Sequence, residues 1–276
     1  MNRSLALGLF AIALTACTDT PSLAPRAVPP DAQPIVNGTP TGNLYASVGA
    51  LLFDFDQNGL SGDDEWCSGS LISPTVFLTA AHCVVSSFTP PGSQFYVSFA
   101  PDLYASNAVF ITATGYVYDP QYGHDRANAH DLALVFLPAG ATSGLTPYRL
   151  PTLGELDALS AQGGLKEAIF VNVGYGTSAS RTGPPSFQYD GTRKWSESMF
   201  MALTPNWLGL LMNTRATGLG GDCYGDSGGP KFLSTNPGVV YAVVVTGDVP
   251  CRATTWDYRT DTQSARGFLG QYVTLP

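Results

Sequence analysis

Hydrophobic residues along this chain gather in short runs that glycine, proline and polar residues interrupt. Runs rich in Val, Leu, Ile and Phe cover residues 46–55, 67–77 and 239–246, and runs of this length and composition are typical of β-strands. The periodicity of amphipathic helices is almost absent. The pattern therefore predicts an all-β fold of short strands.

Residues 1–34 form a separate region in front of these runs. A short basic stretch and an apolar run over residues 5–16 predict a signal peptide at residues 1–16, because the run is too short to span a bilayer. Leu14-Thr15-Ala16-Cys17 resembles the bacterial lipobox, which predicts lipidation of Cys17; a plain signal peptide that contains a cysteine is the alternative. Residues 17–34 are proline-rich and predict an extended linker. The expected location is the bacterial cell envelope, as a lipoprotein, or the periplasm or extracellular space after release.

Composition and charge narrow the function classes. The chain has 276 residues, of which 44% are hydrophobic, enough for one large domain or two small ones with their own cores. Its formal net charge of -8 at pH 7 argues against nucleic acid and anionic membrane surfaces as partners. No other run is long and apolar enough to cross a membrane, so membrane contact is expected only through a lipid anchor.

One glycine-rich turn offers what a nucleophile needs. In the motif GDSGGP at residues 225–230, the glycines permit turns that a Cβ would forbid. The amides of Gly225 and Ser227 can then converge on the oxyanion that forms when the Ser227 hydroxyl attacks a carbonyl. Such turns around a serine are common, so the assignment depends on partner residues.

A histidine and an aspartate earlier in the chain supply those partners. His82 lies in TAAHC at residues 79–83, and Asp131 lies in HDLALV at residues 130–135. A serine hydroxyl needs an imidazole to accept its proton and a buried carboxylate to hold the imidazole in the correct tautomer. With these motifs in the order His, Asp, Ser, the chain resembles the trypsin and chymotrypsin family of serine endopeptidases from about residue 35 to near the C-terminus.

The resemblance implies a fold and a reaction. The fold would be two six-stranded antiparallel β-barrels, at about residues 35–150 and 151–276, with the triad between them and a short helix at residues 264–272. Ser227 would attack a peptide bond, His82 would shuttle the proton, and Asp131 would orient His82, with an acyl-enzyme intermediate. The amides of Gly225 and Ser227 would hold the oxyanion. A monomer acting on a protein or peptide, without a required cofactor, is expected; residues 178–195 predict a loop.

Two other histidines lie near Asp131. His124 and Asp125 belong to a polar stretch that predicts a surface loop, whereas Asp131 leads an apolar run. Asp131 is therefore the predicted triad aspartate. His130 would point to the other side of an extended chain and is expected to be structural.

The cysteines predict two disulfides. Without Cys17, four cysteines remain, and an exported chain with four favours two bridges among three connectivities. The resemblance selects Cys67 with Cys83 and Cys223 with Cys251. A metal site is the alternative, but no CxxC spacing supports it.

The segment that begins at Ile35 resembles the mature N-terminus of the family. The resemblance implies that cleavage before Ile35 frees an amine that pairs with the buried Asp226. Gln33 and Pro34 precede the bond instead of the usual Arg or Lys, so autoactivation is not expected. Either a separate activating protease makes the cut, or trimming proceeds stepwise, or the active form uses another partner for Asp226. If Cys17 is lipidated, this cleavage would also release the enzyme from its anchor.

The specificity pocket is less well determined. The residue six before the nucleophile, at the pocket floor in relatives, is Gly221, so the carboxylate of a typical trypsin is missing. Asp222 and Asp257 could place a negative charge near a substrate Lys or Arg, or could be solvated rim residues. Thr246 keeps a hydroxyl that could hydrogen-bond Asp131, and Asp248 adds a charge to the cleft. Basic and mixed or apolar specificity both stay open.

An acidic stretch at residues 54–65 fits the calcium-loop pattern of oxygen ligands. The ligands would be Asp54, Asp56, Asn58 and Glu65. Because the flanking residues predict strands rather than helices, an acidic hairpin loop is the alternative. Structural calcium is therefore a second hypothesis for this loop.

Two further functions compete with the peptidase. A catalytically silent homologue could act as a surface-binding protein, although such a protein has no need of His82, Asp131 and Ser227 together. An esterase or other acyl hydrolase could use the same residues. Amide and ester substrates would separate this last alternative from a peptidase.

Overall fold

A computed structural model describes residues 36, 38–125, 127–179 and 185–276 of the chain. The signal peptide, the linker, the lipidation of Cys17 and the new N-terminus at Ile35 all fall outside these ranges and stay predictions. Within the described ranges, no helix has both the length and the apolar character that a membrane crossing requires.

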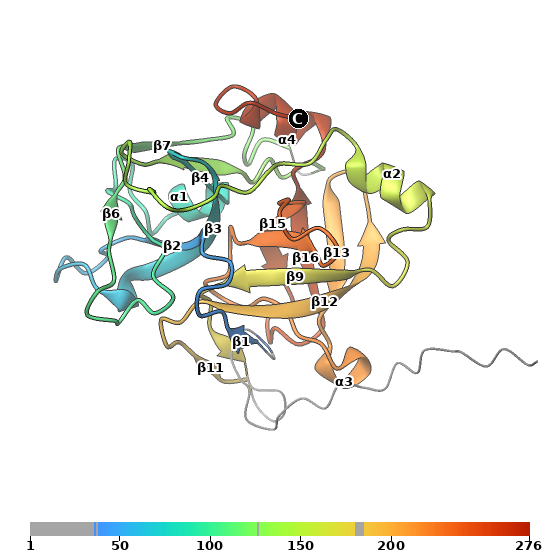
Figure 1. The fold of residues 1–276 in the computed structure, drawn as a ribbon, viewed down its shortest axis with the longest axis horizontal. Helices are drawn as coiled ribbons and strands as arrows, with labels where there is room; N and C mark the ends of the chain where they lie inside the picture. Colours follow the sequence, from blue (N-terminus) through green and yellow to red (C-terminus); the bar gives the residue numbers. More distant parts are fainter. Residues whose placement is uncertain (1–35, 37, 126, 180–184) are drawn as a thin grey trace, which may run out of the picture.

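The first barrel is built from a sheet with the strand order β6-β5-β2-β3-β4-β8-β7, coloured blue to green in Figure 1. Its strands are β2 (Val48–Leu52), β3 (Glu65–Ser73), β4 (Val76–Thr79), β5 (Tyr96–Ser98), β6 (Ile111–Thr112), β7 (Gly115–Tyr118) and β8 (Ala133–Phe136). Only residues 113–114 separate β6 from β7, and their N–H groups continue the two ladders, to Phe95 O (3.0 Å) and Phe136 O (2.8 Å). Strands β6 and β7 are thus pieces of one bent strand, and the sheet curls round as six.

The second barrel has the strand order β1-β12-β13-β16-β15-β14-β9, and an additional pairing between β12 and β9 closes six of these strands into a ring. Its strands are β1 (Thr39–Pro40), β9 (Ile169–Gly174), β12 (Lys194–Leu203), β13 (Trp207–Leu211), β14 (Pro230–Leu233), β15 (Ala242–Gly247) and β16 (Thr254–Arg259). All pairings between these strands are antiparallel. The predicted all-β fold with two barrels is therefore confirmed.

Short helices connect and cover the barrels. They are the 3-10 helix η1 (Gly62–Asp64) and the α-helices α1 (Ala81–Val84), α2 (Glu155–Ala161), α3 (Thr214–Thr217) and α4 (Gln263–Leu269). Helix α4 corresponds to the predicted C-terminal helix, and the Thr262 hydroxyl caps it by accepting from Ala265 N (3.1 Å). The sequence pattern missed α2, because only Leu156 of its seven residues is buried.

The segment predicted as a loop at residues 178–195 contains more regular structure than expected. Strands β10 (Ser178–Ala179) and β11 (Phe187–Gln188) pair as a short hairpin, and β12 already begins at Lys194. The strands are only two residues long, so their pairing leaves no periodic signal in the sequence.

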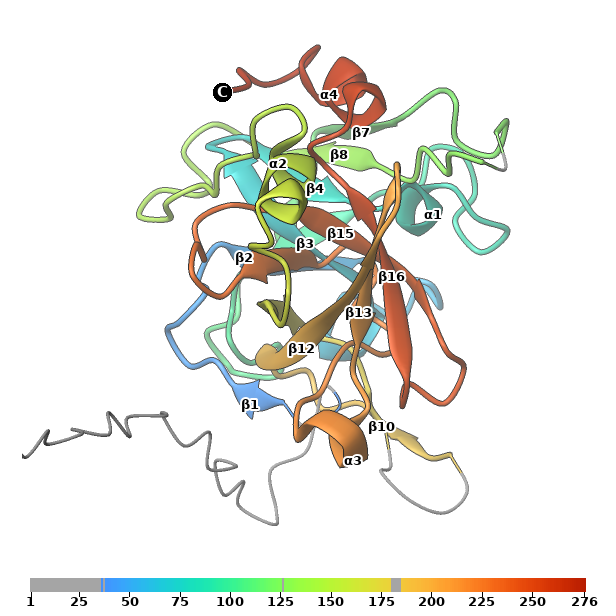
Figure 2. The same cartoon turned by 90° about the vertical axis from the view of Figure 1, so that its right-hand side faces the viewer.

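One hydrophobic core joins the two barrels. It includes Phe77 and Val135 from the first barrel and Phe232, Val243 and Tyr258 from the second. Figure 2 shows α4, at the end of the second half, beside β7 and β8 of the first barrel. Leu269 of α4 belongs to the shared core. Because the packing crosses the boundary, the surfaces of the two barrels are fixed relative to each other.

Both predicted disulfides are confirmed. Cys67 of β3 is bonded to Cys83 of α1, with their Cα atoms 6.2 Å apart, and Cys223 is bonded to Cys251 with a Cα separation of 5.3 Å. Disulfides persist in oxidising compartments, so these bonds agree with an exported protein. The first bond ties the helical turn that carries His82 to the first barrel.

Candidate active site

His82 and Asp131 form a closely bonded pair in the first barrel. The His82 ring nitrogen Nδ1 lies 2.8 Å from Asp131 Oδ2, and the His82 backbone N–H donates to Asp131 Oδ1 at 2.9 Å. The Asp131 side chain is 5% exposed and that of His82 30%. A buried carboxylate thus fixes both the backbone and the ring of His82, while the ring keeps access to solvent.

Ser227 lies in a turn that is held against the segment leading to His82. Its carbonyl accepts from Ser68 N (2.8 Å) on strand β3. The next residue, Gly228, has φ of 80°, and a Cβ there would lie 2.1 Å from Thr79 Oγ1. Glycine is therefore needed at this position both for the backbone conformation and for the contact. The turn around Ser227 is brought to the residues just before His82.

The amides beside Ser227 are not used by the fold. Within the described residues, neither the N–H of Gly225 nor that of Ser227 donates to a protein acceptor. Gly225 has φ of 95°, a conformation that side chains rarely adopt. The described residues also provide no hydrogen bond between the Ser227 hydroxyl and His82. Two unengaged N–H groups next to a hydroxyl are what an oxyanion site requires.

The sequence did not single out Ser68, which organises this turn. Its hydroxyl donates to Gly225 O (3.0 Å) and accepts from Tyr175 N (2.9 Å), and its carbonyl accepts from the Thr79 hydroxyl (2.8 Å). Ser68 is fully buried. Its place directly after Cys67 was the available signal, because that cysteine is bonded next to His82.

A second Asp–His–Ser group lies near the first but has a different geometry. His130 Nδ1 lies 3.0 Å from Asp119 Oδ2 and 3.1 Å from Ser264 Oγ. Both contacts use the same ring nitrogen, so the group cannot relay a proton from serine to carboxylate across the ring. His130 is held by these hydrogen bonds, but its backbone has φ of 52°, so the chain is not extended there as the prediction assumed. Asp125 is exposed and accepts from Ala127 N (2.8 Å) in a surface turn.

Comparison with known proteins identifies the family. The model of the family described as Trypsin matches residues 57–267, which is most of the chain. The chain belongs to the trypsin family.

Relatives in this family share the fold at low identity. Glucanase inhibitor protein 4 of Phytophthora infestans is 26% identical over 191 residues, covering 66% of this chain and 68% of the relative. The structure of human heparin binding protein matches with a TM-score of 0.62 and 20% identity, over 87% of this chain and 96% of that chain. An atomic-resolution structure of HBP matches with a TM-score of 0.63 and 20% identity, over 88% and 98%. These names denote an inhibitor and a binding protein, so catalysis must be argued from this chain's own residues.

A pocket next to Ser227 has a volume of about 350 Å³. Its lining includes three of the predicted pocket residues, Asp222, Thr246 and Asp248. Gly221 does not line it, because the Met212 side chain occupies the space where a Cβ on Gly221 would lie, 2.3 Å from Met212 Cβ. Asp257 also lies outside the lining, fully buried behind the pocket.

Two expectations about the pocket wall are wrong in detail. The Asp248 carboxylate accepts three backbone N–H groups, from residues 252–254 at 2.7–2.9 Å, so it closes its own loop instead of adding a free charge to the cleft. No hydrogen bond within the described residues joins Thr246 to Asp131. The Thr246 carbonyl accepts from the Thr255 hydroxyl (3.2 Å) on the neighbouring strand.

Asp226 lies in a closed site beneath the Ser227 turn. Its carboxylate accepts from Gly176 N (2.9 Å) and Cys223 N (2.8 Å), and the residue is 1% exposed. Burial, with added repulsion from Asp222, raises the pKa of Asp226 to about 7. Val36, the residue after Ile35, is buried and accepts from Gly221 N through its carbonyl (3.1 Å). The chain that follows the predicted cleavage point is thus already docked beside this region.

Glu65 does not belong to the acidic loop that precedes it. Its Oε1 is sealed from solvent without a hydrogen-bond partner in the described residues, and both carboxylate oxygens face Gly225. Burial and then repulsion from Asp226 raise the pKa of Glu65 well above its usual range. The prediction of Glu65 as a calcium ligand is therefore wrong, because strand β3 turns the side chain inward.

The carboxylates that do gather in the acidic loop are those of Asp54, Asp56 and Asp64, whose oxygens lie within 4.8 Å of one another. The side chain of the predicted ligand Asn58 is hydrogen-bonded to Asp56 at 2.6 Å. The Asp64 carboxylate also accepts a hydrogen bond from Ser61 N (2.7 Å), as part of a capping box. Calcium binding by this loop stays a prediction.

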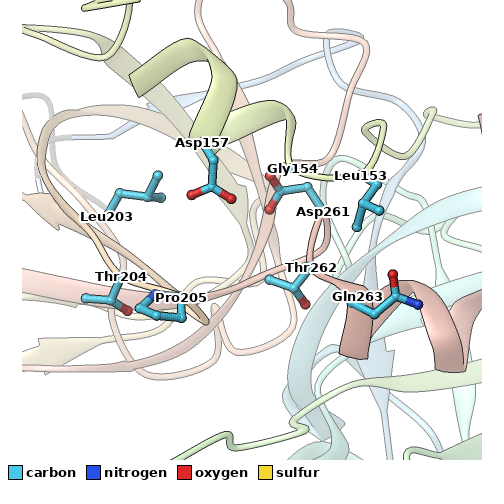
Figure 3. A pocket seen from close by; sticks show the side chains of 9 residues that line it. All are labelled: Leu153, Gly154, Asp157, Leu203, Thr204, Pro205, Asp261, Thr262 and Gln263. Atoms are coloured by element: carbon cyan, nitrogen blue, oxygen red, sulfur yellow. The ribbon is translucent and has the colours of Figure 1, made fainter. Parts of the chain in front are cut away.

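Figure 3 shows a second hollow, between α2 and the start of α4. Its volume is about 460 Å³, and Asp157 and Asp261 contribute the carboxylates. Both carboxylates are bonded to the guanidinium of Arg259, at 2.7–3.1 Å. The two carboxylates share this one guanidinium, and the hollow shares no lining residue with the pocket beside Ser227.

Proposed function

We propose that the chain is a serine endopeptidase in which Ser227, His82 and Asp131 act as the triad. The observation that carries this proposal is the pair of hydrogen bonds between His82 and the buried Asp131, one from the backbone N–H and one from the ring. It occupies Nδ1 and leaves the other ring nitrogen for the Ser227 hydroxyl, which is the arrangement that a general base needs. The docking of the Ser227 turn against residues 79–80 gives it further support.

The reaction proceeds by acyl transfer. Ser227 Oγ attacks the peptide carbonyl carbon while His82 Nε2 accepts the hydroxyl proton, and the oxyanion receives the N–H groups of Gly225 and Ser227. The C–N bond then breaks as His82 returns the proton to the leaving amine. Water, deprotonated by His82, releases the acyl group from Ser227. Asp131 stays ionised and stabilises the imidazolium in both halves.

We also propose activation by cleavage before Ile35. The new amine would pair with Asp226, whose buried carboxylate is hydrogen-bonded only to backbone N–H groups within the described residues, with Lys231 acting on it without a hydrogen bond. The docked position of Val36 supports this route, because its bridge with Gly221 holds the chain beside the segment that leads to Asp226. A separate protease would make the cut. Residues 35–150 and 151–276 would form the two halves of the mature domain.

Lipidation of Cys17 would make the precursor an envelope lipoprotein, and cleavage before Ile35 would release it. Mass spectrometry of the membrane fraction would test this directly. The expected species carries lipid on Cys17 and does not react with fluorophosphonate, whereas active enzyme still attached to lipid would contradict the release model.

The relatives named for inhibition and binding favour one second candidate, a surface-binding protein without turnover. Hydrolysis of chromogenic amide and ester substrates separates the functions. We expect Ser227→Ala to reduce amide hydrolysis about a millionfold without changing the thermal midpoint. The matched control is Ser264→Ala, which removes the hydroxyl of the second Asp–His–Ser group and should leave activity intact. Equal activity of Ser227→Ala and the natural protein would refute the assignment, and turnover of esters alone would indicate an acyl hydrolase.

A further inference from the structure

A buried lysine is bonded to one of the carboxylates that line the pocket. Lys231 on β14 is fully buried, and its ammonium is hydrogen-bonded to Asp222 Oδ2 and to Asn172 Oδ1, the latter at 2.7 Å. Asp222 is 5% exposed and lines the pocket, whereas Lys231 does not. A substrate side chain entering the pocket would therefore meet a carboxylate that already has a cation.

A second carboxylate lies on the far side of the same ammonium. Asp257 Oδ1 is 3.7 Å from Lys231 Nζ and accepts from the Thr255 hydroxyl (3.0 Å), while its Oδ2 has no partner in the described residues. Burial, opposed by Lys231 and reinforced by Asp222, raises the pKa of Asp257 well above its usual range. Lys231 therefore makes its hydrogen-bonded ion pair with Asp222, while Asp257 lies farther from the ammonium.

The rest of the pocket is mostly apolar. Met212 covers the position of Gly221 at the floor, and the Cys223–Cys251 disulfide and the valines of β15 form the walls. The Asp248 carboxylate points into its own loop, where it accepts backbone N–H groups. An apolar side chain can therefore fill the pocket without leaving a charge unpaired.

We propose that Lys231, acting through Asp222, sets the substrate class: the enzyme cleaves after uncharged, mainly apolar residues and rejects Lys and Arg. This inference rests on the proposed peptidase activity. A basic side chain would have to lose its hydration in the pocket without gaining a free counter-charge, because Asp222 is already neutralised from within. Lys231 is a specificity-determining residue that does not itself touch substrate.

The test replaces the ammonium by a neutral side chain of similar length. In Lys231→Met, Asp222 loses its internal cation and becomes a free carboxylate at the pocket floor. We expect the ratio of kcat/KM for peptides with Arg before the cleaved bond to that for Leu to rise about tenfold or more. The matched control is Lys231→Met combined with Asp222→Asn, which removes the whole ion pair and should restore the natural preference. A loss of packing alone would affect both variants equally.

The natural protein supplies a test that does not depend on the fold of a variant. A peptide library should give hydrolysis after Leu, Met or Phe at least about tenfold faster than after Lys or Arg. A preference for Lys or Arg in the natural protein would overturn the proposal. So would a folded Lys231→Met variant with an unchanged ratio.

Benzamidine, a small aromatic cation, separates failure of this inference from failure of the proposed function. Its binding, measured as a rise in thermal midpoint, requires no turnover. We expect a rise for Lys231→Met and none for the natural protein or the double variant. If fluorophosphonate fails to label Ser227 but benzamidine behaves in this way, the peptidase proposal fails and the charge assignment stands. A rise for the natural protein would contradict the assignment directly.

Discussion

The interiors of the two barrels differ although their strands follow the same antiparallel plan. On the strands of the first barrel, Glu65 is the only charged residue, and the buried polar residues are hydroxyls such as Ser70 and Ser98. The second barrel buries four charged residues within its strands, Lys194, Lys231, Asp257 and Arg259, and two of them, Lys231 and Asp257, lie behind the pocket. Buried charges are costly, and replacing them by apolar residues is often neutral or stabilising. Their presence behind the pocket therefore points to recognition rather than stability.

From this contrast we infer that the two barrels have different roles. The first barrel holds the groups that would transfer the proton, with His82 on helix α1 and Asp131 just before strand β8. The second holds the groups that would choose the substrate. Changes near the first should therefore alter rate at constant preference, and changes inside the second should alter preference and stability.

Among the changes that test this contrast between the barrels, the largest effect is expected from Asp131→Asn. The amide cannot hold His82 in the tautomer that accepts the Ser227 proton, and kcat should fall about ten-thousandfold, which is the usual cost of the wrong tautomer in a Ser-His-Asp triad. Preference between Arg and Leu substrates should not change. Steady-state kinetics on both substrates provide the measurement, with Asp119→Asn as the matched control at the other His–Asp pair. A fall of similar size in the control would show that the region acts structurally.

Next in size is the stability cost of Lys231→Met. Removing one member of a buried ion pair leaves Asp222 unpaired, and the free energy of unfolding should fall by about 3 kcal/mol. Urea unfolding of this variant and of the double variant with Asp222→Asn gives the comparison. If the double variant is no more stable than Lys231→Met, then loss of packing, not charge, dominates the interior of the second barrel.

A smaller effect is expected from pH. The folded precursor holds the Asp226 proton up to about pH 7, whereas an unfolded chain releases it near pH 4. Between these values the folded state binds more protons, so stability should decline as pH rises through this window. The pKa values of Glu65 and Asp257 shift in the same direction, so Asp226→Asn should reduce the slope without abolishing it.

Thermal midpoints from pH 4 to pH 8 would measure this slope. Cleavage before Ile35 should weaken or reverse it, because an amine beside Asp226 favours the ionised carboxylate. An identical slope in the precursor and in the cleaved form would argue against the pairing of Ile35 with Asp226.

The smallest effect is expected inside the first barrel, from Ser70→Ala. The Ser70 hydroxyl is buried without a hydrogen-bond partner in the described residues. Its removal should change the free energy of unfolding by less than about 1 kcal/mol in either direction, because a buried hydroxyl without a partner adds little stability. A cost as large as that of Lys231→Met, measured by urea unfolding, would remove the contrast between the two interiors.

The sequence predicted features that local chemistry determines. Short apolar runs identified the strands, and the three motifs identified the residues that the fold brings to one region. The two-residue strands of the β10–β11 hairpin and the isolated Leu156 of α2 left no pattern to read. Their structure depends on tertiary contacts that propensity does not encode.

The charges behind the pocket could be predicted only in part. Lys231 follows the GDSGGP motif directly and interrupts an apolar strand, which was a readable signal of a buried cation. Its partners could not be predicted, because they lie in other parts of the second barrel. Asp257 is on strand β16 and Asp222 precedes strand β14, which carries Lys231. Glu65 was misassigned for a related reason: its spacing fits a calcium loop, but the inward face of β3 decides where it points.

The most direct test of the central claim is the intact mass of the purified protein before and after exposure to a fluorophosphonate. The account predicts one adduct per chain, located on Ser227, on a species that begins at Ile35, and none on Ser227→Ala. An unlabelled species that begins at Ile35 would contradict it, because the His82–Asp131 pair would then lie beside a serine that it does not activate.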